Sequence, residues 1–255
     1  MLTVDLNSDL GESFGPWTMG HDEALMTSIT SANIACGFHA GDPSVMRQTI
    51  RLAKQHGVAV GAHPGFPDLV GFGRREMQLS TGEVEDLVLY QLAAIAGVAS
   101  AEGVRLQHVK AHGALYNMAA RDGSLARAIA RAVAAFDRTL VLLGLPNSAL
   151  LREGDAAGLR VAAEVFADRT YESDGSLTSR RVSGSVIQDS AQVVTRAVDM
   201  VTTGQVTATD GTIVRLRADT ICLHGDTPGA ADLARQVRAA LEAAGIKVAA
   251  LATTL

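Results

Sequence analysis

The sequence has few cysteines, and their spacing predicts no structural framework. Cys36 and Cys222 are the only two in 255 residues. Two cysteines are too few for a set of disulfides or for a zinc knuckle, and a reducing cytosol keeps isolated thiols reduced. We therefore expect both side chains to be free thiols in the hydrophobic core, where free cysteine is commonly found.

Positive charge and long apolar runs are also scarce. The 22 basic residues include only three lysines, no basic run occurs, and the formal net charge is -5. Nucleic-acid binding needs clustered positive charge, so we expect no nucleic-acid partner. The sequence has no run of about 18 apolar residues, and no basic segment followed by an apolar stretch at its start. We expect a cytoplasmic protein that has no membrane segment.

Several common catalytic motifs are absent. A nucleotide-binding P-loop requires G-x-x-x-x-G-K-[ST], and none of Lys54, Lys110 and Lys247 follows a glycine. The sequence has one G-x-S-x-G match, at residues 11–15, but it lies in the long segment between a predicted strand that ends at residue 7 and a predicted helix that begins at residue 21, so it is not the sharp strand-to-helix turn of a nucleophile elbow. No G-x-G-x-x-G turn follows a predicted strand, and Gly71 and Gly73 lie in a predicted loop. The absences disfavour a serine nucleophile and hydride transfer. Any ATP must be held in another way or by another chain.

Short β-rich runs alternate with longer helical patterns along almost the whole chain, which is 47% hydrophobic. The predicted strands cover residues 2–7, 32–36, 58–62, 106–111, 139–143, 159–164 and 220–223. The predicted helices cover residues 21–30, 43–56, 81–102, 125–136, 147–154, 190–203 and 228–244, with Pro43 and Pro228 suited to first helical positions. This order and length predict one α/β domain, residues 1–255, folded as a parallel (β/α) barrel. An open doubly wound sheet is the alternative.

Two long polar segments interrupt this alternation. They cover residues 64–75 and 166–181, follow predicted strands and have neither helical nor strand periodicity. Long connections of this kind in a compact domain are often lids or binding loops. The competing interpretation is that they are ordinary surface loops.

The positions of polar residues predict which side of each strand faces the barrel interior. Successive side chains of a strand point to opposite faces, so residues two apart share a face. On five strands, the polar residues fall on one face and the apolar residues on the other. The polar sets are Asp5, Asn7 and Asp9; Asn33 and His39; His108, Lys110 and His112; Glu164; and Cys222, His224 and Asp226. The apolar faces suit contact with helices, so the polar sets are expected to point into the barrel.

Most of these polar residues lie at the carboxyl end of a predicted strand or just beyond it. Barrel interiors are normally filled by apolar side chains, so ionisable groups must be paired there or concentrated at an open end. A single histidine near a strand end is usually structural. Agreement among five strands instead predicts a polar functional site at the carboxyl ends, where α/β proteins place their chemistry.

Five dense segments carry a family resemblance. They are DLNSDLGESFG at residues 5–15, NIACGFHAGDP at 33–43, GAHPGFPD with GFGRR within 61–75, KAHGALYN at 110–117 and LHGDTPGA at 223–230. Together and in this order they resemble the LamB/YcsF family over essentially the whole chain. The resemblance implies a seven-stranded, incomplete parallel (β/α) barrel of the polysaccharide-deacetylase type.

The resemblance also implies an activity and partners. The implied reaction is hydrolysis of the lactam 5-oxo-L-proline to L-glutamate, coupled to cleavage of ATP to ADP and phosphate, in a complex with 5-oxoprolinase subunits B and C. ATP would be a co-substrate shared with those partners. Two alternatives stay open: a stand-alone metal-dependent amide or carbohydrate deacetylase, and a non-catalytic subunit that binds the lactam for its partners.

The lactam is an unstrained amide, so this reaction needs a cation for the substrate carboxylate, donors for the developing oxyanion and a base for water. The residues expected in catalysis are Asp9, Glu12, His39, Asp42, His63, Lys110 and His112. The residues expected to bind substrate are Asn7, Asn33, Glu164, Arg169 and His224. Structural roles compete with three of these: Asn7 in hydrogen bonds within the barrel, Asp42 as a helix cap, and Lys110 in a buried ion pair.

A few further residues have expectations of their own. His21 and His56, near helix ends, are expected at the surface, whereas Tyr116 and Asn117 either line the pocket or begin a helix. The deacetylases that the resemblance points to bind a divalent metal with one Asp and two His, but their paired H-[ST]-x-x-H-P pattern is missing here. A divalent metal therefore stays an open alternative, and the sequence assigns no ligand set.

Overall fold

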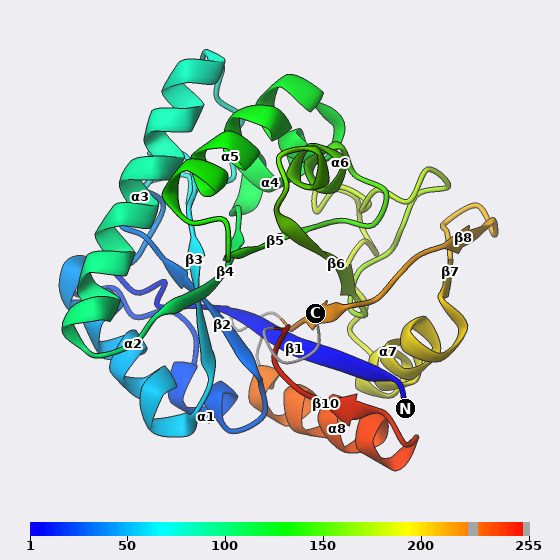
Figure 1. Cartoon of the computed structure of the whole chain (residues 1–255). Helices are drawn as coiled ribbons and strands as arrows, with labels where there is room; N and C mark the ends of the chain where they lie inside the picture. The colour runs from blue at the N-terminus through cyan, green and yellow to red at the C-terminus, as the bar shows by residue number, and fades with distance from the viewer. Residues whose placement is uncertain (224–228, 252–255) are drawn as a thin grey trace.

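Seven parallel strands form a barrel in the computed structural model, which describes residues 1–223 and 229–251 (Figure 1). The strands are β1 (Thr3–Leu10), β2 (Ser31–Ala35), β3 (Ala59–His63), β4 (Leu106–Lys110), β5 (Val141–Gly144), β6 (Arg160–Phe166) and β9 (Thr220–Cys222). Each overlaps a strand predicted from the sequence. The short β-rich runs in the sequence therefore located every strand of the barrel.

The barrel is closed by hydrogen bonding between its first and last strands. β1 pairs with β2 on one side and with β9 on the other, where Asp5 lies opposite Thr220 and Asn7 opposite Cys222. β9 also pairs with β6, which completes the ring. The predicted parallel (β/α) barrel is confirmed, and it is incomplete in having seven strands where the eightfold barrel has eight. The alternative prediction of an open doubly wound sheet is wrong, because an open sheet has two unpaired edge strands and here β9 pairs with both β1 and β6.

Helices surround the strands as an outer ring (Figure 1). They are α1 (Asp22–Met26), α2 (Pro43–His56), α3 (Thr81–Ala101), α4 (Gly113–Arg121), α5 (Gly123–Phe136), α6 (Ala149–Ala156), α7 (Ser190–Thr203) and α8 (Ala230–Ala243). The sequence did not predict α4, nor the antiparallel hairpin of β7 (Gln205–Thr207) and β8 (Ile213–Arg215), nor β10 (Lys247–Val248), which extends the start of β1. The start signal at Pro228 lies outside the described residues.

Local sequence signals set the ends of the helices that follow the site strands. Asp42 caps α2 by accepting hydrogen bonds from the backbone N–H groups of Ser44 and Val45. The helix ends at Gly57, whose φ of 68° is the left-handed conformation that glycine adopts most readily. A capping box at Ser80 begins α3. These signals fix where the chain turns back to start the next strand.

α3 is long and apolar enough to cross a membrane by length and composition. Those two properties are weak evidence, because core helices of globular proteins share them. In the fold α3 packs against α2, α5 and β3. Its buried residues include Val84, Leu92 and Ile95. Its apolar character is therefore explained by packing within the outer ring of helices around the barrel.

The barrel separates apolar and polar side chains as the alternation predicted. Leu6, Ile34, Val109 and Ile221 face outward into one hydrophobic core shared with the helices. The opposite face of the same strands carries buried polar side chains: Asp5, Asn7, Asn33, His108, Lys110, Glu164 and Thr220. Because buried polar groups must be paired with one another, the interior of the barrel is a connected polar network.

Candidate active site

The lowest layer of this network surrounds Asp5. Its carboxylate accepts hydrogen bonds from the hydroxyls of Thr30 and Ser31, both at 2.6 Å, and from Thr220 at 2.5 Å. Burial nevertheless raises the pKa of Asp5 to about 6. All three hydroxyls belong to β2, β9 or the residue before β2. Asp5 therefore joins β1, β2 and β9 inside the barrel, where it has a structural role.

The next layer is a chain of amides ending at an imidazole. The amide nitrogen of Asn33 donates to Oδ1 of Asn7 at 2.7 Å, and its own oxygen lies 2.8 Å from Nε2 of His108. Burial lowers the pKa of His108 to about 3, so the ring is neutral and Nε2 is the donor. Gly61 makes room for this ring, because a Cβ there would lie 2.1 Å from Nε2. Asn7 and Asn33 thus support the floor of the site.

Above this floor, Lys110 joins carboxylates from two other strands. Its ammonium nitrogen lies 2.8 Å from Oδ1 of Asp9 and 2.8 Å from Oε1 of Glu164. Burial alone would lower the pKa of Lys110, but these carboxylates raise it well above its usual range. Burial likewise opposes ionisation of Asp9, yet His63 and Lys110 hold its pKa well below the ordinary value. Lys110 and Asp9 are therefore a charged pair.

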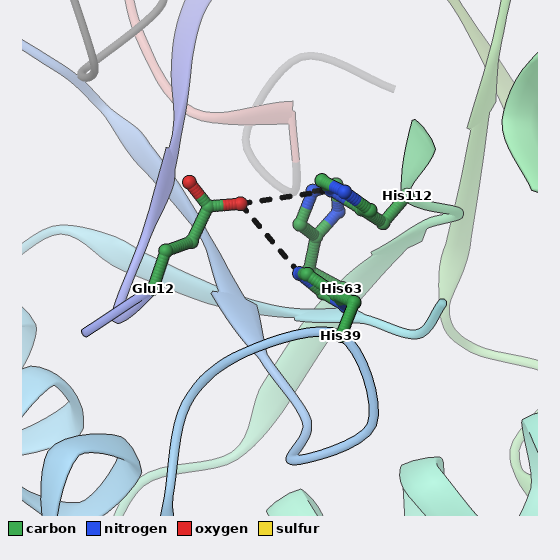
Figure 2. A group of neighbouring side chains, drawn as sticks. All are labelled: Glu12, His39, His63 and His112. Carbon is green, nitrogen blue, oxygen red and sulfur yellow. Dashed lines mark hydrogen bonds and ion pairs between the residues drawn. The ribbon is translucent and has the colours of Figure 1, made fainter. Parts of the chain in front are cut away.

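Three imidazoles and a carboxylate lie at the mouth of the barrel, and we call Glu12, His39, His63 and His112 the histidine cluster (Figure 2). His63 ends β3, whereas the other three follow β1, β2 and β4. The rings of His39 and His112 stack in parallel, with centroids 3.7 Å apart. Burial lowers the pKa of His112 to about 3 and that of His39 well below its usual value. These two rings are neutral.

The loop between β3 and α3 covers the histidine cluster. The backbone carbonyl of Phe72 accepts a hydrogen bond from Nε2 of His112 at 2.8 Å. Gly73 has a φ of 62°, and a Cβ there would lie 2.8 Å from side-chain atoms of both His39 and His112. The backbone of this loop thus approaches the rings closely and orients one of them. The loop predicted at residues 64–75 is part of the site.

Other predicted site residues lie elsewhere. Asp42 caps α2 and also accepts from the backbone N–H of Gly15 at 2.8 Å, which accounts for its carboxylate as a structural group. Arg169 is buried in the loop after β6, where it donates to the backbone carbonyls of Thr178 and Ser185. These bonds give Arg169 the role of ordering that loop. His224 lies outside the described residues.

Two further buried residues belong to the site: Cys222, which the sequence placed in the core and on an inward-facing polar set, and Tyr116, for which it left open a position lining the pocket or beginning a helix. Cys222 was expected in the core, and it is buried as a free thiol whose Sγ lies 3.1 Å from Nζ of Lys110. Tyr116 lies in α4 and is also buried, and burial together with the charge of Glu164 raises its pKa well above its usual value. The alternation of Cys222 with Leu223 was the available signal for the first. His21 and His56 are exposed, as predicted.

The site can therefore perform acid–base and electrostatic chemistry without a nucleophilic serine. It combines an ammonium group, an ionised carboxylate and neutral imidazoles that can accept a proton. Asp9 is the more accessible partner of Lys110, since its side chain is 17% exposed while that of Glu164 is 0% exposed.

Comparison with known proteins gives close matches over the whole chain. The LamB/YcsF family matches residues 4–255. The A subunit of 5-oxoprolinase from Methylococcus capsulatus is 59% identical over 98% of this chain and 96% of its own length. The crystal structure of a lactam utilization protein from Thermus thermophilus has a TM-score of 0.93 and 53% identity, covering 98% of this chain and 100% of that one.

A more distant solved structure shares the fold alone. The peptidoglycan deacetylase PdaC from Bacillus subtilis has a TM-score of 0.51 at 12% identity, covering 99% of this chain and 89% of that one. The deacetylase-like barrel expected from the sequence is thus confirmed as a fold. Identity at this level transfers no activity.

Proposed function

The chain belongs to the LamB/YcsF family, and we propose that it is one subunit of an ATP-dependent 5-oxoprolinase, which hydrolyses 5-oxo-L-proline to L-glutamate. Relatives named as the A subunit of 5-oxoprolinase align over nearly its whole length. One observation on the structure carries the proposal: the charged pair of Lys110 and Asp9 lies beneath buried imidazoles at the carboxyl ends of the barrel strands. This is the combination that opening of an amide requires.

The chemistry of lactam hydrolysis suggests a role for each of these side chains. Water attacks an unstrained lactam slowly, and transfer of a phosphoryl group from ATP to the amide oxygen makes its carbon electrophilic. Lys110 then supplies positive charge to the substrate carboxylate or to the transferring phosphoryl group. With no metal ion at the histidine cluster, a free ring nitrogen of His112 or His39 accepts the proton of the attacking water. Asp9 holds Lys110 in position.

The proposal includes partners. The chain has no P-loop, so we propose that ATP is held together with 5-oxoprolinase subunits B and C. The reaction then belongs to the complex, in the cytoplasm, and not to this chain by itself. A subunit that merely delivered lactam would not need a base at the reacting centre, so the role of the histidines separates these two possibilities.

Reconstitution tests the proposal. We expect the purified chain alone to turn over neither ATP nor 5-oxoproline, and we expect glutamate formation coupled to ADP release once subunits B and C are added. His112→Asn should lower turnover by about a hundredfold, as the loss of a general base does, and His56→Asn, at an exposed imidazole, should not. ATP-dependent turnover by the chain alone would overturn the division of labour. Release of acetate from an acetylated sugar by the chain alone would favour the deacetylase alternative.

A further inference from the structure

The histidine cluster has the donor set of a metal centre. Its four side chains come from four consecutive strands or the segments that follow them, and one ligand atom from each lies within 4.8 Å of every other. The imidazoles are buried, with His39 at 0%, His63 at 1% and His112 at 4% exposure. Buried polar groups have hydrogen-bond partners or ligands, and imidazole nitrogens that converge on one point can share one.

Two backbone carbonyls fix which ring nitrogens face that point. Nδ1 of His63 lies 2.8 Å from the carbonyl oxygen of Lys110, and Nε2 of His112 lies 2.8 Å from that of Phe72. A carbonyl only accepts hydrogen bonds, so both of these nitrogens carry the proton. If the second nitrogen of each ring carries no proton, Nε2 of His63 and Nδ1 of His112 present lone pairs, which is the state that metal binding requires. This outer hydrogen bond to a carbonyl is typical of histidines that bind metals.

These two lone pairs face each other. Nε2 of His63 lies 3.0 Å from Nδ1 of His112, and in this tautomer neither nitrogen can donate a hydrogen bond to the other. Two ligand nitrogens that are each about 2.0–2.1 Å from a tetrahedral zinc ion lie about 3.3 Å apart. The observed separation is close to that edge, so a cation between the rings would convert a repulsive contact into two bonds.

His39 gives an independent reason to expect a cation at the histidine cluster. Among the described residues, neither of its ring nitrogens has a hydrogen-bond partner, although the side chain is completely buried. Its Nε2 lies 3.6 Å from Oε1 of Glu12, and the same oxygen lies 3.6 Å from Nδ1 of His112 (Figure 2). A buried imidazole without a hydrogen-bond partner is destabilising, and coordination would satisfy it.

We propose that Glu12, His39, His63 and His112 form a binding centre for one divalent transition-metal ion, of which zinc fits the ligands best. The atoms that converge, and that we assign as ligands, are Oε1 of Glu12, Nε2 of His39, Nε2 of His63 and Nδ1 of His112. Three imidazoles and one carboxylate suit Zn²⁺, Co²⁺ or Ni²⁺ and not Mg²⁺ or Ca²⁺, which prefer oxygen ligands. When bound, such an ion supplies Lewis-acid polarisation of a substrate carbonyl.

This ligand set differs from the one Asp and two His considered from the sequence. Asp9 lies 3.4 Å from Nε2 of His63, but its other oxygen is already engaged by Lys110 at 2.8 Å. Glu12, whose Oε1 lies 3.6 Å from both His39 and His112, takes its place as the carboxylate ligand. The alternative to a metal ion is a proton on Nε2 of His63 that is shared with Asp9. Such a proton would explain the close approach of the two rings without a metal. The metal centre does not rest on the proposed function, because binding is measured without turnover.

The test uses the full chain after removal of metal with a chelator. We expect Zn²⁺ to bind at one equivalent per chain and to raise the melting temperature, and Co²⁺ to give the visible absorption of a coordinated ion. Glu12→Gln and His112→Asn should each weaken Zn²⁺ binding by about a hundredfold. His56→Asn, which removes an exposed imidazole, should bind as tightly as the wild type.

Several results would overturn the metal centre. These are no saturable binding of Zn²⁺ or Co²⁺, equal binding by the two cluster variants and the wild type, or equal loss in His56→Asn. The first of them would favour the shared proton. If a cluster variant does not fold, X-ray absorption of the cobalt-loaded wild type decides: three imidazole ligands support the centre, and a coordination shell of oxygen atoms alone contradicts it.

Discussion

The ammonium nitrogen of Lys110 lies 2.8 Å from Oδ1 of Asp9, inside the barrel and one layer below the histidine cluster. Glu164 contacts the same nitrogen at 2.8 Å from another strand. One cation thus pairs with two carboxylates. Removing the cation leaves like charges uncompensated in a buried site, which costs more free energy than the pair itself contributes. Lys110 therefore has a structural role whether or not it also takes part in catalysis.

Lys110→Met should reduce both stability and turnover. Loss of one partner from a buried ion pair costs about 3–5 kcal/mol, so we expect a clearly lower melting temperature. The matched variant Lys110→Met with Glu164→Gln removes one carboxylate together with the cation and should recover much of that stability. If Lys110 contacts the reacting centre, turnover by the folded double variant should still be lower by about thirtyfold or more. Turnover within about threefold of wild type would leave Lys110 a purely structural role.

Asp5 should make the protein less stable as the pH rises. Its pKa in the folded protein is about 6 and its ordinary value is 3.8, so the folded state binds the proton more tightly. The resulting stabilisation is fully present below pH 3.8 and is lost as the pH rises through about 6. The difference is worth about 3 kcal/mol.

Denaturation with urea at a series of pH values measures this effect. Relative to wild type, Asp5→Asn should gain stability between about pH 4 and pH 7, because its side chain cannot ionise. Asp42→Asn is the matched control of opposite sign. Hydrogen bonds from the backbone N–H groups of Gly15 and Val45 lower the pKa of Asp42, so its contribution is lost on acidification. Parallel pH profiles for wild type and Asp5→Asn would contradict the prediction.

The interior of the barrel could be predicted from the sequence because a strand has a period of two. Once Leu6 and Val109 are assigned to the outer face, Asn7 and Lys110 must point inward. Asp42 and Arg169 show where this reasoning ends. They lie beyond their strands, where no period fixes the direction of a side chain, and nearby backbone groups engage both. The alternation along a strand therefore predicts the direction of side chains within the strand, and it does not predict the direction of side chains in the loops that follow.

The organisation of the histidine cluster could not be predicted in the same way. Its members were each predicted, but their tautomers depend on the carbonyl groups of Phe72 and Lys110, which carry no side-chain signal. α4 was not assigned as a helix, and Tyr116 and Asn117 were left either lining the pocket or beginning one; in the structure Tyr116 is both helical and buried. Contacts made by backbone atoms are set by the path of the loops, which the residue pattern does not specify.

Gly61→Ala should disrupt the floor of the site. A Cβ at this position would lie 2.1 Å from Nε2 of His108, and that ring is held by Asn33 inside a closed barrel. Overpacking in a core costs about 1–3 kcal/mol, and the rigid ring places this case at the upper end. Gly97→Ala in α3 is the control, since a Cβ there meets nothing within 4 Å and should stabilise the helix by about 0.5–1 kcal/mol. Melting temperatures that shift in the same direction for both variants would contradict this account.

The last prediction concerns the partners that the proposed function requires. Three loops at the carboxyl ends of the strands expose large apolar side chains: Trp17 is 67% exposed, Val70 is 92% exposed and Val182 is 53% exposed. Exposed aromatic and aliphatic groups around a mouth are typical of surfaces that become buried in a complex, and tryptophan often dominates their binding energy. We therefore expect subunits B and C to cover this mouth.

Binding of the chain to immobilised subunits B and C tests this expectation. Trp17→Ala should weaken binding by about thirtyfold, the usual effect of truncating a central aromatic contact, and Val70→Asp should weaken it further by placing a charge in an apolar contact. Leu2→Ala is the matched control, because Leu2 is 51% exposed but precedes β1 at the opposite end of the barrel. Weakening by Leu2→Ala with no effect of Trp17→Ala would place the interface at the amino ends of the strands. In that case the mouth would stay open to substrate in the complex, and the partners would have to deliver ATP from elsewhere.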